Sequence, residues 1–327
     1  MEKYYNISNN NVRVGDVMMN DFLYVEKYRP KTVEECVLPD SIKNVFCTLR
    51  DKGEIINLLL SGGAGTGKTS IARALCNELG CDYIIINGSE SRGIDMVRQQ
   101  VSSFASTMST NGKVKVVILD EADYITPEAQ AALRNLIESF SSSCRFILTC
   151  NFKAKIIQPL HSRCSVVDFT IDRSELPKLQ AEFAKRVISI LKAENVEFNT
   201  EVVLEVIKRY FPDNRRCLNE LQRYANISGN IDTGILSVVD SSKVRSLIEF
   251  MKKKDFKSCR QWIADNPDPD VLFSELYTNI SCLVDSTSIP ELILIMGEYQ
   301  HRAAFVASQE INLAAFVVEV MKGIKWK

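Results

Sequence analysis

Short apolar runs alternate with amphipathic stretches between about residue 55 and residue 170. The apolar runs are INLLL, YIIIN, VKVVILD, RFILTCN and SVVDF. Each run is nearly continuous, which is typical of strands that are buried on both faces of a sheet. The stretches between them have helical spacing, and Pro127 begins one of them, as proline does in a first helical turn. The pattern therefore predicts a five-stranded parallel α/β sheet with crossover helices.

The pattern changes after Phe169, where the apolar positions take helical spacing and no strand candidate follows. Residues 174–194, 200–211 and 214–227 are predicted to form a three-helix module. The segment NISGNIDTG, at about 226–234, is expected to be a hinge, and the chain beyond it is predicted to be helical. The predicted organisation is an N-terminal arm at 1–20, a core at 21–170, a helical module at 171–231 and a helical domain at 232–327.

The charge balance excludes one broad class of function. The 327 residues include 40 basic and 41 acidic side chains, so the formal net charge is −1. A strongly basic nucleic-acid binder is therefore excluded. Any grip on a phosphate backbone must be local, or must be assembled from several subunits.

The cysteines and histidines indicate neither a zinc site nor a disulfide framework. The ten cysteines include no CxxC pair, and the chain has only two histidines. Several cysteines lie inside apolar segments, as reduced thiols do in a reducing compartment. No apolar run approaches 18 residues, and the first residues lack an apolar signal core. The sequence predicts an intracellular protein that does not span a membrane.

A complete Walker A pattern, LLLSGGAGTGKT, stands between an apolar run and the helix-forming segment SIARALCNELG. In such a loop glycines let backbone N–H groups converge on phosphate oxygens, Lys68 brings a charge to the β and γ phosphates, and the Thr69 hydroxyl can ligate magnesium. A simple glycine-rich turn is disfavoured because strand and helix signals flank the loop. The residues predicted to bind ATP here are Gly62, Gly63, Ala64, Gly65, Thr66, Gly67, Lys68, Thr69 and Ser70.

Polar side chains end two of the later apolar runs. In VKVVILDEAD, Asp120 would hold Mg²⁺ through water, and Glu121 would polarise a water for attack on the γ-phosphate. Asn151 ends RFILTCN. Its amide would orient the attacking water or touch the γ-phosphate, the alternative being an amide that caps the following turn. The sequence thus predicts an ATPase that uses Mg²⁺.

Five motifs in one order carry a resemblance to a known family. They are the phosphate loop, DEAD, TCN, the SRC of QPLHSRC, and the N-terminal YVEKYRPKTVEECVLP. Together they resemble the clamp-loader family of AAA+ ATPases, which is related to replication factor C. The pattern continues through FPDNRRCLNELQ and covers about two-thirds of the chain, whose length and closing KWK are most similar to bacteriophage members. The resemblance implies an AAA+ P-loop core followed by a helical lid and a helical collar.

The resemblance also implies roles for single residues. Tyr28, Arg29 and Val37 would form the adenine pocket. Arg163 would be an arginine finger that reaches in trans to ATP in a neighbouring subunit, the alternative being an ordinary surface charge. Arg215 would be the sensor 2 arginine that contacts the nucleotide in cis, with its neighbour Arg216 as the competitor for that role.

Two segments would concern macromolecular partners. Ser91, Arg92 and Gly93 are similar to the family's DNA-facing loop, where amides and a guanidinium would follow phosphates without reading bases. The alternative is a helix N-terminus that its own serines satisfy. Phe104 and Met108 match the position at which the family presses apolar side chains into the sliding clamp, the alternative being a stripe that faces the core. Gln130, in the helix after DEAD, would link DNA contact to Glu121.

The family implies ATP-driven loading of a ring-shaped sliding clamp onto primer-template DNA. The expected partners are the clamp, the DNA backbone, other copies of the chain and a distinct small subunit, in the cytoplasm of an infected bacterium. Two alternatives stay open: another AAA+ remodeller, such as a helicase loader or branch-migration motor, and a scaffold subunit that binds ATP without hydrolysing it.

Overall fold

The five apolar runs form one parallel sheet in the computed structural model, which describes residues 22–90, 93–109, 112–235, 242–265, 269–303 and 305–327. The strand order is β2-β3-β4-β1-β5, and every neighbouring pair is parallel. The strands are β1 (Leu58–Ser61), β2 (Tyr83–Asn87), β3 (Lys115–Asp120), β4 (Cys144–Cys150) and β5 (Ser165–Asp168). The prediction of a five-stranded parallel P-loop core is therefore confirmed.

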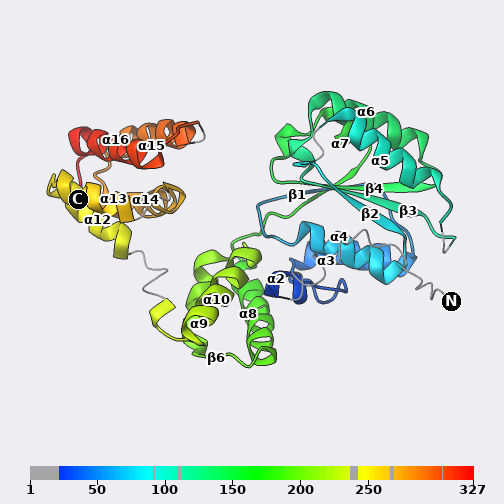
Figure 1. Ribbon diagram of the computed structural model, residues 1–327, viewed down its shortest axis with the longest axis horizontal. Coiled ribbons are helices and arrows are strands. Elements are labelled where there is room, and N and C mark those ends of the chain that lie inside the picture. The colour runs from blue at the N-terminus through cyan, green and yellow to red at the C-terminus, as the bar shows by residue number, and fades with distance from the viewer. Residues whose placement is uncertain (1–21, 91–92, 110–111, 236–241, 266–268, 304) are drawn as a thin grey trace, which may run out of the picture. The chain divides into compact units, whose positions relative to one another are not determined.

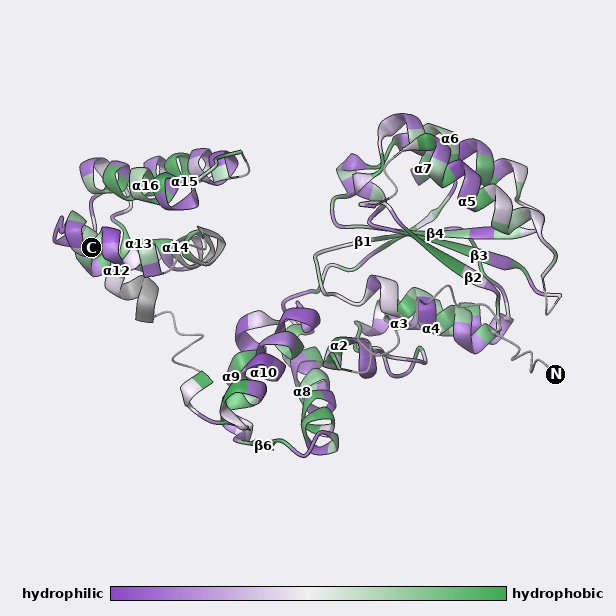
Figure 2. Ribbon diagram, in the orientation of Figure 1, coloured by the Kyte–Doolittle hydropathy of each residue, from purple (hydrophilic) through white to green (hydrophobic). Residues whose placement is uncertain are grey.

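Helices cover both faces of this sheet (Figure 1). One face packs on α3 (Asp40–Lys52) and α4 (Lys68–Leu79), through alternate strand residues such as Leu58 and Leu60. Leu59, between them, points into the other hydrophobic core. That core is closed by α5 (Ile94–Ser106), α6 (Pro127–Ser139) and the short α7 (Gln158–His161). The strands are consequently apolar along most of their length (Figure 2), which is why they read as continuous runs.

The register of the strands sets the place of the later polar residues. Leu119 in β3 lies beside Leu148 in β4, so the next residues along the two strands, Asp120 and Thr149, reach the same edge of the sheet. Thr149 also lies beside Leu60 of β1, just before the phosphate loop. This carboxyl edge is where open α/β sheets bind ligands.

Three helices follow the sheet, as the periodicity predicts: α8 (Leu176–Ala193), α9 (Thr200–Tyr210) and α10 (Asn214–Ser228). The Asn199 side chain caps α9, and the Asp213 side chain caps α10 by accepting the Arg216 N–H. The expectation that this part holds no strand is wrong, because β6 (Glu197–Phe198) and β7 (Asn230–Ile231) form a short parallel pair. Two residues are too few to show strand periodicity in a sequence.

The predicted hinge packs against α10 in the residues that the structure describes. Ile231 and Ile235 are buried, and the Tyr224 hydroxyl donates to Asp232 Oδ1 at 2.7 Å. The chain divides into two compact units after residue 235. The borders predicted at residues 20, 170 and 231 stay predictions.

The second unit is helical where it is described. Its helices are α12 (Ser242–Lys252), α13 (Phe256–Asp265), α14 (Pro269–Leu283), α15 (Ile289–Ala303) and α16 (Gln309–Gly323). They share one hydrophobic core, in which the Phe316 ring lies against the Phe273 and Tyr299 rings. No helix among the described residues is both long and apolar enough to cross a membrane.

Candidate nucleotide-binding site

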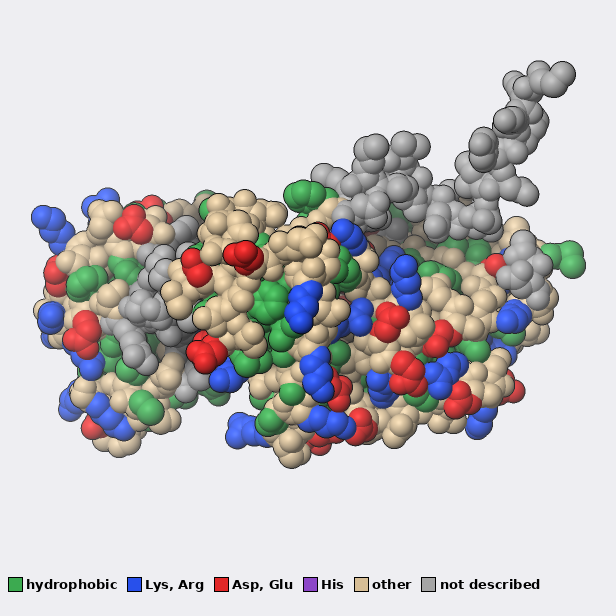
Figure 3. All heavy atoms as spheres, turned by 90° about the horizontal axis from the view of Figure 1, so that it is seen from below, with side chains coloured by type: hydrophobic (Ala, Val, Ile, Leu, Met, Phe, Trp, Pro, Cys, Tyr) green, Lys and Arg blue, Asp and Glu red, His purple; other side chains and the backbone are tan. Residues whose placement is uncertain are grey.

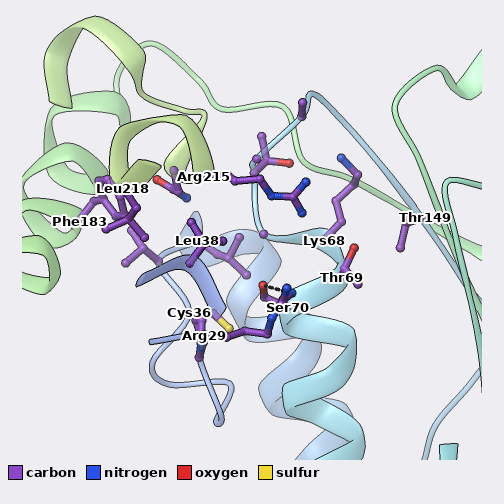
Figure 4. Close-up of a pocket in the computed structure, with 18 of the residues that line it drawn as sticks. Arg29, Cys36, Leu38, Lys68, Thr69, Ser70, Thr149, Phe183, Arg215 and Leu218 are labelled. Atoms are coloured by element: carbon purple, nitrogen blue, oxygen red, sulfur yellow. Dashed lines mark hydrogen bonds between the residues drawn. The ribbon is translucent and has the colours of Figure 1, made fainter. Parts of the chain in front are cut away.

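A pocket opens at the carboxyl edge of the sheet (Figure 4). Its walls come from the phosphate loop, the ends of β3 and β4, the segment that precedes α3, and the lid helices α8 and α10. The segment before α3 begins with a short helix, α2 (Tyr24–Lys27), which packs on α10. The pocket therefore joins parts of the chain that are up to about 190 residues apart, since Val25 and Leu218 both line it.

The phosphate loop needs glycine at two positions for different reasons. Gly67 has a φ of 92°, in the left-handed region, and leads directly into α4. Gly65 has a φ of 70°, and a Cβ there would fall 1.8 Å from Asp213 Oδ1 of the lid. The Asn214 N–H also donates to the Gly65 carbonyl at 3.2 Å. The loop and the N-terminus of α10 thus touch, while the first N–H groups of α4 face the pocket as an anion site.

Lys68 holds the loop and the sheet edge together. Its Nζ atom donates to the carbonyls of Gly62 at 2.8 Å and Gly63 at 2.7 Å, and to Asn151 Oδ1 at 3.0 Å. The side chain is buried, and burial lowers the pKa of its ammonium group from the ordinary value. Asn151 therefore turns its amide into the pocket. This favours the nucleotide contact over the turn cap.

Asp120 accepts hydrogen bonds from two hydroxyl groups. Thr69 Oγ1 and Thr149 Oγ1 each lie 2.6 Å from Asp120 Oδ1, and Thr149 Oγ1 also accepts the Glu121 N–H at 3.0 Å. The Thr69 hydroxyl and the Asp120 carboxylate are hard oxygen ligands of the kind Mg²⁺ prefers, so the residues present fit this ion. The sequence reasoning missed Thr149, which is 2% exposed; its signal is a hydroxyl in an otherwise apolar run.

Glu121 adopts an unusual backbone conformation at the edge of the pocket. Its φ is 55° and its ψ is 45°, a left-handed geometry that is uncommon for a residue other than glycine. The neighbouring strand leaves it little freedom: a Cβ at Gly88 would fall 2.4 Å from the Glu121 carbonyl oxygen, and the Gly88 N–H donates to the Asp120 carbonyl at 2.7 Å. The constrained backbone thus fixes the direction in which the Glu121 side chain projects from the main chain.

The opposite end of the pocket is more apolar. Tyr28, Arg29 and Val37, the residues that the family resemblance implies for the adenine pocket, line it together with Cys36 and Leu38. Phe183 of α8 and Leu218 of α10 close it from the lid, and in Figure 4 they lie across Leu38 from the Lys68 end. This end is suited to a base, whereas the Lys68 end is suited to phosphates.

The structure separates the two candidate sensor 2 residues. Arg215 lines the pocket, and Figure 4 shows its guanidinium directed toward the Lys68 side. The Arg216 guanidinium instead lies 4.9 Å from the centre of the Tyr210 ring. The geometry therefore favours Arg215 for contact with a nucleotide in cis.

Arg163 does not line this pocket. Its Nε donates to Glu138 Oε1 at 2.8 Å, its Nη2 makes a further contact with the same oxygen, and its Nη1 donates to the Pro159 carbonyl at 2.9 Å. These hydrogen bonds hold the pKa of Glu138 below its usual value. The role of Arg163 toward a nucleotide held by a neighbouring subunit stays a prediction.

The residues that the resemblance implies for DNA and clamp contact are only partly described by the structure. Ser91 and Arg92 lie outside the described residues, and Gly93 immediately precedes α5. Met108 is 94% exposed. Phe104 lies between the two alternatives: its ring is half-buried against the sheet core, and the ring centre is 4.8 Å from Lys115 Nζ.

Gln130 joins two loops at the sheet edge. It is 1% exposed; its Nε2 donates to the carbonyls of Ile125 at 3.0 Å and Lys155 at 3.1 Å, and its Oε1 accepts the Ile157 N–H at 2.9 Å. One loop follows Glu121 and the other follows Asn151. Gln130 is therefore placed to connect them, although the described contacts include none with the Glu121 side chain.

Basic and acidic side chains are interspersed over the face of the molecule seen in Figure 3. This agrees with the near-zero net charge of the sequence. It also agrees with the expectation that DNA contacts are local.

Comparison with known proteins places the chain in a family. Residues 58–173 match the ATPase family associated with various cellular activities (AAA), and residues 177–237 match the sliding-clamp-loader large subunit AAA+ ATPase lid domain. The sliding-clamp-loader large subunit of Escherichia phage RB69 is 36% identical, covering 92% of this chain and 96% of the relative, and that of Enterobacteria phage T4 is 34% identical with the same coverage. The replication factor C small subunit of Archaeoglobus fulgidus is 32% identical, covering 92% and 97%.

A solved structure shares the fold at lower identity. The Thermotoga maritima RuvB Holliday junction branch migration motor aligns with a TM-score of 0.51 and 17% identity, covering 68% of this chain and 78% of that one. It supports the AAA+ fold alone. The sequence relatives agree with the phosphate loop, with the two hydroxyls on Asp120 and with the lid over the pocket. The chain therefore belongs to the clamp-loader family of AAA+ ATPases, as do the large subunits of the T4-type bacteriophages.

Proposed function

We propose that the chain hydrolyses ATP to load a ring-shaped sliding clamp onto primer-template DNA, as one subunit of an oligomeric clamp loader. The observation that carries the ATPase part is the meeting of Lys68, Asp120, Glu121 and Asn151 around one pocket. The similarity to clamp-loader large subunits over 92% of the chain supports the clamp and DNA part.

The roles in the pocket follow from the contacts. The N-terminus of α4 and Lys68 bind the β and γ phosphates, because they gather N–H groups and one ammonium in a confined space. Thr69 and, through water, Asp120 would hold Mg²⁺, which would supply positive charge opposite the phosphates. Glu121 accepts a proton from the attacking water, and Asn151 orients that water or the γ-phosphate.

Assembly completes the site. Arg215 contacts the phosphates from the lid of the same chain, whereas Arg163 serves the pocket of a neighbouring copy. A fixed cation near the γ-phosphate stabilises transition-state charge. Hydrolysis in each subunit therefore depends on the docking of its neighbour.

The partner contacts are proposed at separate places. Ser91, Arg92 and Gly93 follow the DNA backbone, Met108 with the half-buried Phe104 contacts the clamp, and Gln130 couples DNA contact to the loop after Glu121. The described second unit serves as a collar that binds other copies and a distinct small subunit. Because the relatives include bacteriophage proteins, we place this activity in the cytoplasm of an infected bacterium.

A reconstituted ATPase assay tests the proposal. The chain, a candidate small subunit, the clamp and primed DNA are combined and turnover is measured with each component omitted in turn. We expect clamp and primed DNA together to stimulate turnover beyond either alone. Glu121→Gln should bind ATP normally but lower turnover on the order of 10² to 10⁴-fold, the range for a lost general base.

Each alternative gives a different result. An AAA+ remodeller of another kind would ignore the clamp, and a scaffold subunit would bind ATP without turnover. Normal turnover by Glu121→Gln would contradict the catalytic assignment.

A further inference from the structure

One lid side chain holds the loop that forms the base end of the pocket. Arg186 lies on α8, one turn beyond Phe183, and both residues line the pocket. Its Nη1 donates to the main-chain carbonyl of Glu35 at 2.9 Å, and its Nη2 donates to the main-chain carbonyl of Tyr28 at 2.9 Å. The two ends of its guanidinium thus join backbone groups that are seven residues apart in the sequence.

The loop depends on these contacts because it has little regular structure of its own. It runs from the end of α2 at Lys27 to the start of α3 at Asp40. Main-chain carbonyls in such a segment must find partners outside a helix or strand. The middle of the loop is tied to the core, where the Val33 N–H donates to Glu78 Oε2 at 2.8 Å. The carbonyls of Tyr28 and Glu35 are tied to the lid by Arg186.

The loop in turn supplies much of the base end. Tyr28, Cys36, Val37 and Leu38 all line the pocket. The two carbonyls that Arg186 holds, those of Tyr28 and Glu35, flank or belong to this set, so their position helps to place these residues relative to the phosphate loop. Arg186 is itself mostly covered, with 24% of its side chain exposed, and its Nη2 lies 3.8 Å from the Glu35 carboxylate, which offsets its charge.

Only an arginine can make this pair of contacts from one position. The guanidinium is planar and presents its donors in a fixed fork, whereas a lysine ammonium is a single point on a flexible stem. Hydrogen bonds from a charged donor are also stronger than those between neutral groups.

We propose that Arg186 is a positioning residue for base recognition: it shapes the Tyr28 to Leu38 loop around the purine of the bound nucleotide and so makes adenine selection depend on lid placement. The inference rests on the proposed nucleotide site. Arg186 lies outside the phosphate loop and the DEAD segment, and is distinct from Asn151 and Arg215.

Substitutions at two positions of α8 distinguish base recognition by Arg186 from a general contribution to the contact between lid and core. Arg186→Met removes both carbonyl contacts. Lys178→Met is the matched control, since Lys178 is also on α8, bonds Asp40 of the core at 2.5 Å, and does not line the pocket. Arg186→Lys keeps the charge and loses the fork.

The measurements are the affinities of the full-length chain for fluorescent ATP and GTP analogues, their dissociation rates, and KM and kcat for ATP in the assembled complex. For Arg186→Met we expect ATP affinity to fall about tenfold, the ratio of ATP to GTP affinity to shrink, and KM to rise by a larger factor than kcat falls. Arg186→Lys should resemble Arg186→Met, and Lys178→Met should resemble the unchanged chain.

The outcomes are distinct. An Arg186→Met chain that folds, as judged by circular dichroism, and keeps the original affinity and ATP to GTP ratio overturns the inference. If that variant does not fold, Arg186→Lys decides, and full retention of base selectivity by it overturns the inference as well. If Arg186→Met and Lys178→Met lose ATP affinity and base selectivity equally, both residues only hold the lid on the core, and the inference is overturned as well. If the unchanged chain binds no ATP, the proposed function itself fails.

Discussion

Lys68 Nζ and Asn151 Oδ1 lie 3.0 Å apart, so the first residue of α4 is hydrogen-bonded to the residue that follows β4. The contact joins the phosphate loop to the sheet edge. Asn151 is held from behind, because its N–H donates to Asp123 Oδ2 at 3.3 Å and the next N–H, of Phe152, donates to the same atom at 3.2 Å. The two side chains therefore face the same part of the pocket. We nevertheless expect them to act at different stages, Lys68 in ATP binding and Asn151 in hydrolysis.

Lys68→Ala and Asn151→Ala should consequently affect different quantities, ATP affinity in the first variant and kcat in the second. Lys68 interacts with phosphates already in the bound state, so its loss should mainly weaken ATP binding. Asn151 acts on the attacking water or the γ-phosphate, so its loss should lower kcat on the order of 10² to 10³-fold while affinity changes little. Equilibrium ATP titration and steady-state turnover measure the two effects.

The control for this pair is Asn44→Ala, which removes an exposed amide on α3 away from the pocket. It should change neither quantity. A purely structural Asn151 would instead show a lowered melting temperature with kcat preserved in the folded fraction.

The sequence predicts the sheet and the phosphate end of the site well, for a physical reason. Strands buried on both faces must be apolar throughout, and phosphate binding requires glycines and a lysine at fixed spacing. Both demands leave a continuous local signature. Asp120 and Glu121 are found in the same way, since Asp120 ends a buried strand and Glu121 directly follows it.

Residues that act through distant partners leave no such signature. Thr149 looks like any β-branched residue in a strand, and its contact with Asp120 depends on strand register. Arg186 looks like a solvated charge on an amphipathic helix, and only the fold brings it to the Tyr28 carbonyl. The half-burial of Phe104 is likewise decided by how α5 rotates over the sheet, which periodicity fixes only roughly.

The half-burial of Phe104 changes what substitution at the proposed clamp surface should do. Met108→Ala should abolish most clamp stimulation and leave the melting temperature unchanged, because an exposed side chain contributes to binding and little to the core. Phe104→Ala should also lower the free energy of unfolding, by about 1 to 2 kcal/mol, less than the 3 to 5 kcal/mol typical of a fully buried ring. Denaturant unfolding and clamp-stimulated turnover separate the effects.

Met96→Ala supplies the matched control for Met108→Ala. Met96 is 51% exposed on α5, the helix that ends two residues before Met108, and is not assigned to the clamp surface. Equal loss of stimulation in both variants would indicate a general effect of exposed apolar area and would remove Met108 from the proposed interface.

Thiol reactivity provides a chemical test of the pocket. Burial raises the pKa of Cys36 to about 12 and that of Cys150 to about 11, and both cysteines line the pocket. A raised thiol pKa means less thiolate at a given pH, and the thiolate is the reactive form. At pH 8, iodoacetamide should therefore modify the exposed Cys282 well before Cys36 and Cys150.

Peptide mapping by mass spectrometry follows each thiol over time. Denaturant should remove the difference, because the raised pKa values depend on burial. Modification of Cys36 or Cys150 at the rate of Cys282 in the native protein would contradict the burial of these two thiols.

The contact between Arg163 and Glu138 leads to a prediction for Glu138. In the single chain the guanidinium is bound to Glu138 and to the Pro159 carbonyl, so it must exchange this partner for a nucleotide to act in a neighbour. The Glu138 carboxylate is half exposed, and exposed ion pairs contribute little to stability. Glu138→Ala should therefore leave folding and turnover intact or raise turnover, because it frees Arg163.

Arg163→Ala should leave ATP binding nearly unchanged and lower turnover on the order of 10³-fold or more, the scale of a lost arginine finger. Mixing Arg163→Ala with Glu121→Gln subunits then tests whether the arginine acts in trans. Some interfaces in the mixture pair an intact Glu121 with an intact Arg163 from the neighbour, so turnover should rise above that of either parent. An arginine acting in cis could not restore activity in this way. Once subunit exchange is demonstrated by mass measurement, mixed complexes that remain as inactive as the parents would rule out the trans assignment and the dependence of hydrolysis on assembly.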